Sequence, residues 1–118
     1  MLYELLSSVI IKNMDISEFK KRAGEIRDLY DEFNQKRAGV KWTRLQLAQG
    51  FVGDVGDLQK LAMAKDGLRE IENVDEKLAH ELSDCLWSVL VLAEKYDIDI
   101  EKEFLKTMDE LEKRITDS

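Results

Sequence analysis

The sequence predicts an all-α fold, an antiparallel bundle of four main helices that is completed by oligomerisation. Proline is absent from the 118 residues, and Leu, Glu, Lys and Ala are frequent, which favours helix throughout. Apolar residues recur at steps of three and four, the period of an amphipathic helix. Short segments containing Gly, Asn or Asp separate four such stretches, as expected of turns between helices. A chain of this length forms one domain around a single core.

The first predicted helix begins after Asp15, which with Glu18 resembles a capping box in which Asp replaces Ser or Thr. The apolar residues behind this cap alternate steps of three and four over five turns. We interpret this stripe as a surface that faces the core. Its members are Ile16, Phe19, Ala23, Ile26, Tyr30 and Phe33.

Residues 1–14 are predicted to be an N-terminal extension, and residues 15–118 the helical domain. The apolar segment 2–11 lacks the basic start and the small-residue cleavage site of a signal peptide, and it is too short to span a bilayer. We therefore expect no membrane association. An extra helix or strand that packs on the domain is the favoured interpretation, and a poorly ordered extension is the alternative.

The second predicted helix runs from Arg44 to Lys65, with Thr43 as its N-cap. Three glycines recur inside it at steps of three, and each costs about 1 kcal/mol relative to alanine in a helix interior. Their spacing indicates close approach by another backbone or a ligand, or else a local kink, and the sequence leaves both open. They are Gly50, Gly53 and Gly56.

The third predicted helix runs from Glu76 to Lys95, after a possible cap at Asn73 or Asp75. Its segment Cys85 to Ala93 is apolar on every side except at Ser88, which is typical of a buried helix. Three other short helices provide too little cover for such a segment. The sequence therefore predicts an oligomer, and we expect a homodimer.

The fourth predicted helix follows a tight corner and has Asp99 as its cap. Its apolar stripe lies opposite a strongly charged face. We interpret most of that charge as a solvated surface, although Lys106 can reach a phosphate if its face turns inward. The stripe consists of Ile100, Phe104, Met108, Leu111 and Ile115.

Charge and cysteine content exclude several classes of function. A net charge of −7 argues against binding to a nucleic acid polymer, since phosphate contacts need a basic surface. The single cysteine, Cys85, allows no intrachain disulfide and fits the cytoplasm. The single histidine, His80, offers no zinc set. A di-iron bundle needs Glu-x-x-His on each of two helices, but Lys77 stands three residues before His80.

Two acidic pairs dominate the sequence, Asp54 with Asp57 and Glu81 with Asp84. Residues at positions i and i+3 share one face of a helix, and Asp54 falls on the apolar side of its own helix. Two antiparallel neighbouring helices would bring the four carboxylates together. Because clustered carboxylates repel one another, they predict a bound hard cation, Mg²⁺ or Mn²⁺. The alternative is two amphipathic helices with solvated acids.

These pairs also carry a resemblance to a known family. GDVGDLQKL, followed after a spacer by ELSDCLWSVLVLAEKYDIDIEKEFLKTMDELEKR, resembles the MazG-like all-α nucleotide pyrophosphohydrolases, whose signature is E-E-x-x-E followed by E-x-x-D. The likeness runs from about residue 25 to residue 114. It implies that Asp54, Asp57, Glu81 and Asp84 are catalytic metal ligands. It also implies hydrolysis of a nucleoside triphosphate (NTP or dNTP) to the monophosphate and pyrophosphate, a reaction that removes unwanted nucleotides from the cellular pool. The resemblance further implies a homodimer or a dimer of dimers.

The chain departs from the family pattern at several positions. Gly53 replaces the first Glu of the signature, and Asp54 and Asp57 replace the other two. Ser88 stands where tyrosine is common, and Glu110 where asparagine often occurs. Asp keeps the charge of Glu but reaches one methylene less far. The alternative function is therefore a catalytically degenerate MazG-like bundle that acts as a nucleotide-binding or partner-binding dimer.

Four residues outside the acidic pairs are candidates for substrate binding. Lys41 and Trp42 precede the second helix, where a charge and an aromatic face can lie beside a nucleotide. A tryptophan that only covers an edge of the core is the equal alternative for Trp42. Ser88, within the apolar segment, and Lys106 of the fourth helix complete the set.

Overall fold

The computed structural model describes residues 15–117, which form four helices and no strand. The helices are α2 (Ile16–Ala38), α3 (Arg44–Lys65), α4 (Val74–Lys95) and α5 (Ile100–Thr116). The predicted all-α class is thereby confirmed. The predicted bounds of α3 hold, whereas α4 begins at Val74 instead of Glu76. The expected N-terminal extension, residues 1–14, lies outside the described residues.

Side-chain caps fix where three of these helices begin. Thr43 Oγ1 accepts a hydrogen bond of 3.1 Å from the backbone N–H of Gln46. Gln46 Oε1 accepts one of 2.9 Å from the N–H of Thr43, which completes a capping box. Asp15 and Asp99 each accept a hydrogen bond of 3.2 Å from the N–H three residues later. The predicted caps at Asp15, Thr43 and Asp99 are therefore formed, whereas Asn73 occupies the N-cap position of α4 without a side-chain hydrogen bond to the helix.

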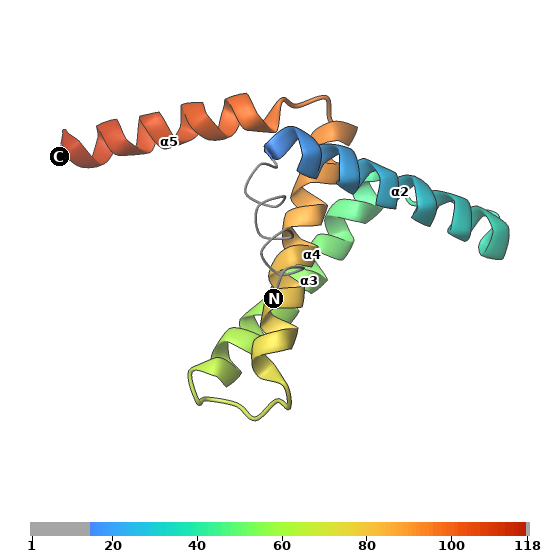
Figure 1. Cartoon of the computed structure of the whole chain (residues 1–118), viewed down its shortest axis with the longest axis horizontal. Helices are drawn as coiled ribbons and strands as arrows, with labels where there is room; N and C mark the ends of the chain where they lie inside the picture. The colour runs from blue at the N-terminus through green and yellow to red at the C-terminus, as the bar shows by residue number, and fades with distance from the viewer. Residues whose placement is uncertain (1–14, 118) are drawn as a thin grey trace, which may run out of the picture.

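Helices α3 and α4 form an antiparallel hairpin (Figure 1). Among the described helices, this pair has the most extensive interhelical contact. At one end the guanidinium of Arg44 lies 4.3 Å from the ring centroid of Tyr96. At the other end Lys65 Nζ lies 2.6 Å from Asp75 Oδ1. These two contacts set the register of the hairpin, and this register brings the first acidic pair opposite the second.

Helix α2 crosses the hairpin at the end where α3 begins and α4 ends (Figure 1). Trp87 of α4 donates a hydrogen bond of 3.1 Å from its indole N–H to the carbonyl of Ala23. Arg27 of α2 forms an ion pair of 3.0 Å with Glu94 of α4. The core lies at this crossing and consists of Ala23, Leu90 and Val91, with Ile16, Leu47, Trp87 and Ile100 packed around them.

Helix α5 extends away from the other three helices after its first residue (Figure 1). Ile100 packs against the core, but no residue of α5 is buried. The radius of gyration is 17.6 Å, whereas a compact chain of this length has one of roughly 13–14 Å. The four predicted helices therefore form an open arrangement within the single chain. None of the described helices has both the length and the apolarity that crossing a bilayer requires.

The prediction that the α2 stripe faces the core is wrong for part of that stripe. Ala23 is buried, but Phe19, Tyr30 and Phe33 are 42%, 56% and 52% exposed. The reason is geometric, because α2 meets the hairpin near Ala23 and its C-terminal half extends beyond it (Figure 1). The sequence periodicity thus identified the face of α2 that contacts the hairpin. It could not show how much of that face the hairpin covers.

The apolar segment of α4 is covered on one side only. Ser88, Leu90, Val91 and Ala93 are buried, as the sequence predicts for an apolar helix. Leu82, Leu86 and Val89 are 53%, 44% and 36% exposed. These three lie at positions i, i+4 and i+7 and so share one face of α4. An apolar face of this helix therefore remains open to solvent in the single chain.

Candidate functional site

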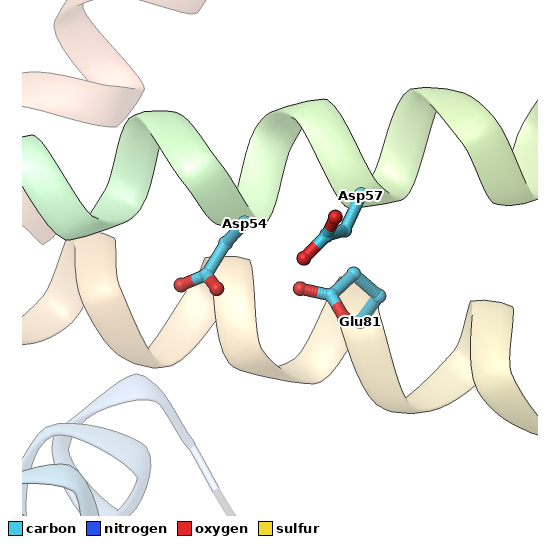
Figure 2. A group of neighbouring side chains, drawn as sticks. All are labelled: Asp54, Asp57 and Glu81. Atoms are coloured by element: carbon cyan, nitrogen blue, oxygen red, sulfur yellow. The ribbon is translucent and has the colours of Figure 1, made fainter.

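Three of the four predicted carboxylates converge between α3 and α4. Asp54 and Asp57 project from one face of α3, and Glu81 projects from α4 toward them (Figure 2). One oxygen from each residue lies within 4.8 Å of the other two. We call these residues the acidic triad. Their approach follows from the i, i+3 spacing on α3 and from the antiparallel register of the hairpin.

The electrostatics of the acidic triad are unfavourable without a cation. Glu81 Oε1 is buried and has no hydrogen-bond partner. Burial, followed by the charges of Asp54, Asp84 and Asp57, raises the pKa of Glu81 above its usual value, and His80 opposes this only slightly. Burial and the charges of Asp84 and Asp57 likewise raise the pKa of Asp54. A buried carboxylate oxygen that faces other carboxylates destabilises the fold unless a positive group compensates it.

A divalent cation would supply the positive charge that the acidic triad needs, and the triad has suitable ligand atoms for it. It offers carboxylate oxygens and no nitrogen or sulfur ligand, a set that suits hard cations. Within the described residues no lysine or arginine forms an ion pair with any member of the triad. The Glu81 carboxylate, with its buried and unpartnered oxygen, is therefore the group whose charge a bound cation would compensate.

Asp84 is placed differently from the other three acids. It lies outside the acidic triad, and its Oδ2 is 3.3 Å from His80 Nε2. Its charge still raises the pKa values of Asp54 and Glu81, so it is electrostatically part of the same site. Its role as a fourth metal ligand stays a prediction.

The thiol of Cys85 also lies in the field of these acids. Burial, followed by the charges of Asp54, Glu81 and Asp84, raises the pKa of Cys85 above its usual value. A thiol with a raised pKa is protonated at neutral pH and is a poor nucleophile. Cys85 is therefore unsuited to covalent catalysis beside the acidic triad.

An open cleft of about 580 Å³ adjoins the triad on the side of α2. Its volume is in the range of about 300–1,000 Å³ that is usual for small-molecule sites. Three aromatic side chains from different parts of the chain line it, Tyr30, Trp42 and Trp87, together with Asp54 and Asp84. Tyr30 and Trp87 meet edge to face, with ring centroids 5.9 Å apart. We call this the aromatic cleft.

Trp42 explains one of the three glycines of α3. A Cβ atom at Gly50 would lie 3.2 Å from Cζ3 of the Trp42 ring, so the absence of a side chain lets the indole lie close to α3. A Cβ at Gly53 or Gly56 would meet no atom within 4 Å. Close approach, by a side chain rather than a backbone, therefore accounts for Gly50 and not for the other two.

The other predicted substrate-binding residues are dispersed. Ser88 is buried and lines a slot next to the aromatic cleft, together with Trp42 and Asp54. Lys41 lines a separate depression along the C-terminal half of α2. Lys106 is exposed on the projecting helix α5. The structure thus brings Trp42 and Ser88 next to the acids but not Lys41 or Lys106.

Sequence reasoning missed the contribution of α2 to the aromatic cleft. Tyr30, Asp31 and Asn34 all line it, and the sequence analysis assigned Tyr30 to the core. A signal was present, because Tyr30 has a hydroxyl in a stripe of apolar residues and Asn34 follows one helical turn later. A polar side chain at the edge of an apolar stripe can mark the rim of a cleft.

A comparison with protein families gave a match that covers the part of the site contributed by α4. The family model of the MazG nucleotide pyrophosphohydrolase domain matches residues 62–117. This stretch is MazG-like. The MazG-like stretch includes α4 and α5 and therefore Glu81 and Asp84, but it begins after Asp54 and Asp57. The place of these two aspartates in the site rests on their convergence with Glu81. Searches of curated proteins and of solved structures gave no match.

Proposed function

We propose that this MazG-like chain is a metal-dependent nucleoside triphosphate pyrophosphohydrolase that uses Mg²⁺ or Mn²⁺. The observation that carries the proposal is the carboxylate of Glu81, which has a buried oxygen without a hydrogen-bond partner and converges with Asp54 and Asp57 beside the aromatic cleft. Such a cation site next to an aromatic surface suits a ligand that combines phosphates with a planar base. The match to the MazG domain supports the same class of substrate.

The acidic triad would hold the cation, and Asp84 is the proposed fourth ligand. When bound, a divalent cation neutralises phosphate charge and lowers the pKa of water. The oxygen of a water molecule forms a bond to the α-phosphorus, and the bond from that phosphorus to the oxygen bridging to the β-phosphorus breaks. Pyrophosphate leaves with the bridging oxygen, and the proton that the attacking water loses passes to the solvent. No side-chain nucleophile is required, which agrees with the protonated state of Cys85.

The aromatic cleft would hold the nucleoside. Trp42 and Tyr30 are about half exposed, so their rings are accessible to a base, and aromatic rings stack on planar groups. Asp31 and Asn34 supply hydrogen-bonding groups in the same cleft. Because Asp54 lines this cleft and belongs to the triad, the α-phosphate of a nucleoside in the cleft would lie next to the cation.

Product analysis tests the bond that is cleaved. With Mg²⁺ or Mn²⁺, a panel of canonical and modified nucleoside triphosphates is expected to give nucleoside monophosphate and pyrophosphate, measured by ion-exchange chromatography. Chelation of the metal should stop the reaction. Nucleoside diphosphate with orthophosphate would refute the assignment of the bond.

The shortened acidic motif offers an explanation if the protein hydrolyses no triphosphate. Gly53 and the two aspartates of α3 reach less far than the glutamates of the family signature. If no triphosphate is turned over with either metal, the site is that of a degenerate bundle that binds a nucleotide or a partner. Retained binding of a non-hydrolysable triphosphate would then support the nucleotide-binding form of that alternative.

We also propose that the chain forms a homodimer through the open faces of α4 and α5. Leu82, Leu86 and Val89 form the exposed apolar face of α4. On α5, Phe104 and Met108 are 57% and 40% exposed, although they belong to one apolar stripe of a strongly amphipathic helix. A second copy of the chain offers the same two faces and can cover both, and such exposed apolar surface usually marks an interface.

Light scattering tests the dimer. At micromolar concentration the wild-type chain is expected to have twice the mass of the monomer, 13.7 kDa. Leu86→Glu places a charge on the exposed face of α4 and should shift the equilibrium to the monomer. Leu68→Glu is the matched control, because Leu68 is also exposed but lies in the loop between α3 and α4. A monomeric wild-type chain would contradict the proposal.

A further inference from the structure

A second open cleft, of about 630 Å³, adjoins the acidic triad on the side opposite α2. It lies between the C-terminal half of α3, the start of α4 and the loop that joins them. Asp57 and Glu81 belong both to this cleft and to the triad. The two lysines Lys60 and Lys77 also line it. We call it the lysine cleft.

The lysines are placed there by the helical repeat. Lys60 follows Asp57 by three residues on α3, and Lys77 precedes Glu81 by four on α4. Each lysine therefore shares a helix face with one acid of the triad. The two faces meet across the hairpin, so both lysines lie along the same cleft as these acids.

Neither lysine forms an ion pair with any of the described residues 15–117, whereas Lys65, one turn beyond Lys60, is 2.6 Å from Asp75. His80 and Glu76 also line the cleft. Its ionisable side chains are thus three carboxylates, two lysines and a histidine. A cation held by Asp57 and Glu81 would offset two of these carboxylates and leave the lysine cleft positive.

The two clefts differ in chemistry and lie on either side of the triad. Three aromatic rings line the aromatic cleft, and Asp54 connects it to the triad. Among the described residues, no phenylalanine, tyrosine or tryptophan lines the lysine cleft, and Asp57 and Glu81 connect it to the triad. Along α3 the order is therefore aromatic cleft, Asp54, Asp57 and lysine cleft, which Figure 2 shows for the carboxylates.

We propose that the lysine cleft binds the β- and γ-phosphates of the substrate and hence the pyrophosphate that leaves. This inference rests on the proposed function, which it deepens by giving the triphosphate a direction along the hairpin. The nucleoside lies toward α2, the α-phosphate lies at the triad, and the terminal phosphates lie toward the loop between α3 and α4. Lysine is suited to this role because its ammonium group acts as a compact positive charge on phosphate.

Calorimetric titration of inorganic pyrophosphate tests the proposal without requiring turnover. In the presence of Mg²⁺, Lys60→Ala and Lys77→Ala are each expected to weaken pyrophosphate binding about tenfold, the effect of one lost charge-assisted hydrogen bond. Lys60→Arg and Lys77→Arg should restore most of the affinity. Binding of a nucleoside monophosphate should change less than twofold in all four variants.

The matched control is the pair Lys36→Ala and Lys102→Ala, which removes the same charge from exposed sites on α2 and α5. If these variants weaken pyrophosphate binding as much, only the net charge matters and the site is refuted. Wild-type protein that binds no pyrophosphate with Mg²⁺ would also refute it. Circular dichroism melting of each variant shows that the fold is kept, since neither lysine is buried.

The outcomes separate this proposal from the proposed function. If triphosphates are hydrolysed but the lysine variants bind pyrophosphate like the wild type, the lysine cleft is wrong and the hydrolase stands. If the lysine variants lose pyrophosphate while no triphosphate is hydrolysed, the cleft stands as a polyphosphate site and the hydrolase fails.

Discussion

Replacing Asp54 with alanine is expected to lower kcat about 10²–10³-fold, the usual effect of removing one preorganised group that stabilises charge in a transition state. Asp54 connects the acidic triad to the aromatic cleft, so under the proposed function its loss would displace the cation from the α-phosphate. A group that acts in the transition state lowers kcat and does not merely raise KM. Steady-state kinetics with saturating Mg²⁺ measure the effect.

Two controls make this result specific. Glu101→Gln removes a carboxylate from the exposed first turn of α5 and should leave kcat within a factor of two. Trp42→Ala removes a ring of the aromatic cleft and should mainly raise KM, because stacking on the base contributes equally to the ground state and the transition state. Equal losses of kcat in Asp54→Ala and Trp42→Ala would contradict the division of the site into a cation part and a nucleoside part.

The substitution Glu81→Gln is expected to change the melting temperature of the protein. A carboxyl with a raised pKa in the folded state contributes stability that is complete below its unfolded pKa and is lost as pH rises through the folded pKa. Since the pKa of Glu81 is raised from 4.5, metal-free Glu81→Gln should melt higher than the wild type at pH 7. This difference should shrink as pH falls toward 4.5. Mg²⁺ should raise the wild-type Tm but not that of Glu81→Gln.

The sequence predicted the parts of the site that depend on local periodicity. The caps at Thr43 and Asp99 and the i, i+3 spacing of Asp54 and Asp57 require only neighbouring residues. The antiparallel hairpin was predicted from the turn signals between the two acidic pairs. Together these features were sufficient to bring Glu81 against α3.

The sequence did not predict features that depend on where distant helices meet. The crossing angle of α2 decides that Ala23 is buried while Tyr30 lines a cleft, and both lie in the same apolar stripe. The direction of α5 likewise decides that its stripe is exposed. The sequence contains a signal for the lysine cleft, since Lys60 and Lys77 stand at helical spacing from the acids, but the sequence analysis assigned no binding role to these two lysines.

Trp87→Ala is expected to reduce the free energy of unfolding by about 3 kcal/mol, the low end of the range for removing a large aromatic side chain from a core. Trp87 is half-buried, packs against the core at the crossing of α2 and α4, and donates its indole N–H to the Ala23 carbonyl. Its loss removes both the packing and the hydrogen bond that hold α2 on the hairpin. Urea denaturation followed by circular dichroism measures the change.

Trp87→Phe and Tyr30→Phe separate packing from polar contacts in this result. Trp87→Phe keeps an aromatic ring in the core but leaves the Ala23 carbonyl without its donor, so it should cost about 1–2 kcal/mol. Tyr30→Phe keeps the ring that meets Trp87 edge to face and should cost less than about 0.5 kcal/mol. If the urea midpoint of Trp87→Ala equals that of the wild type, other contacts hold α2 on the hairpin. The aromatic cleft would then not depend on the contact of Trp87 with α2. If it unfolds at a lower urea concentration, the Trp87 indole holds α2 on the hairpin, and the same indole lines the aromatic cleft proposed to bind the nucleoside.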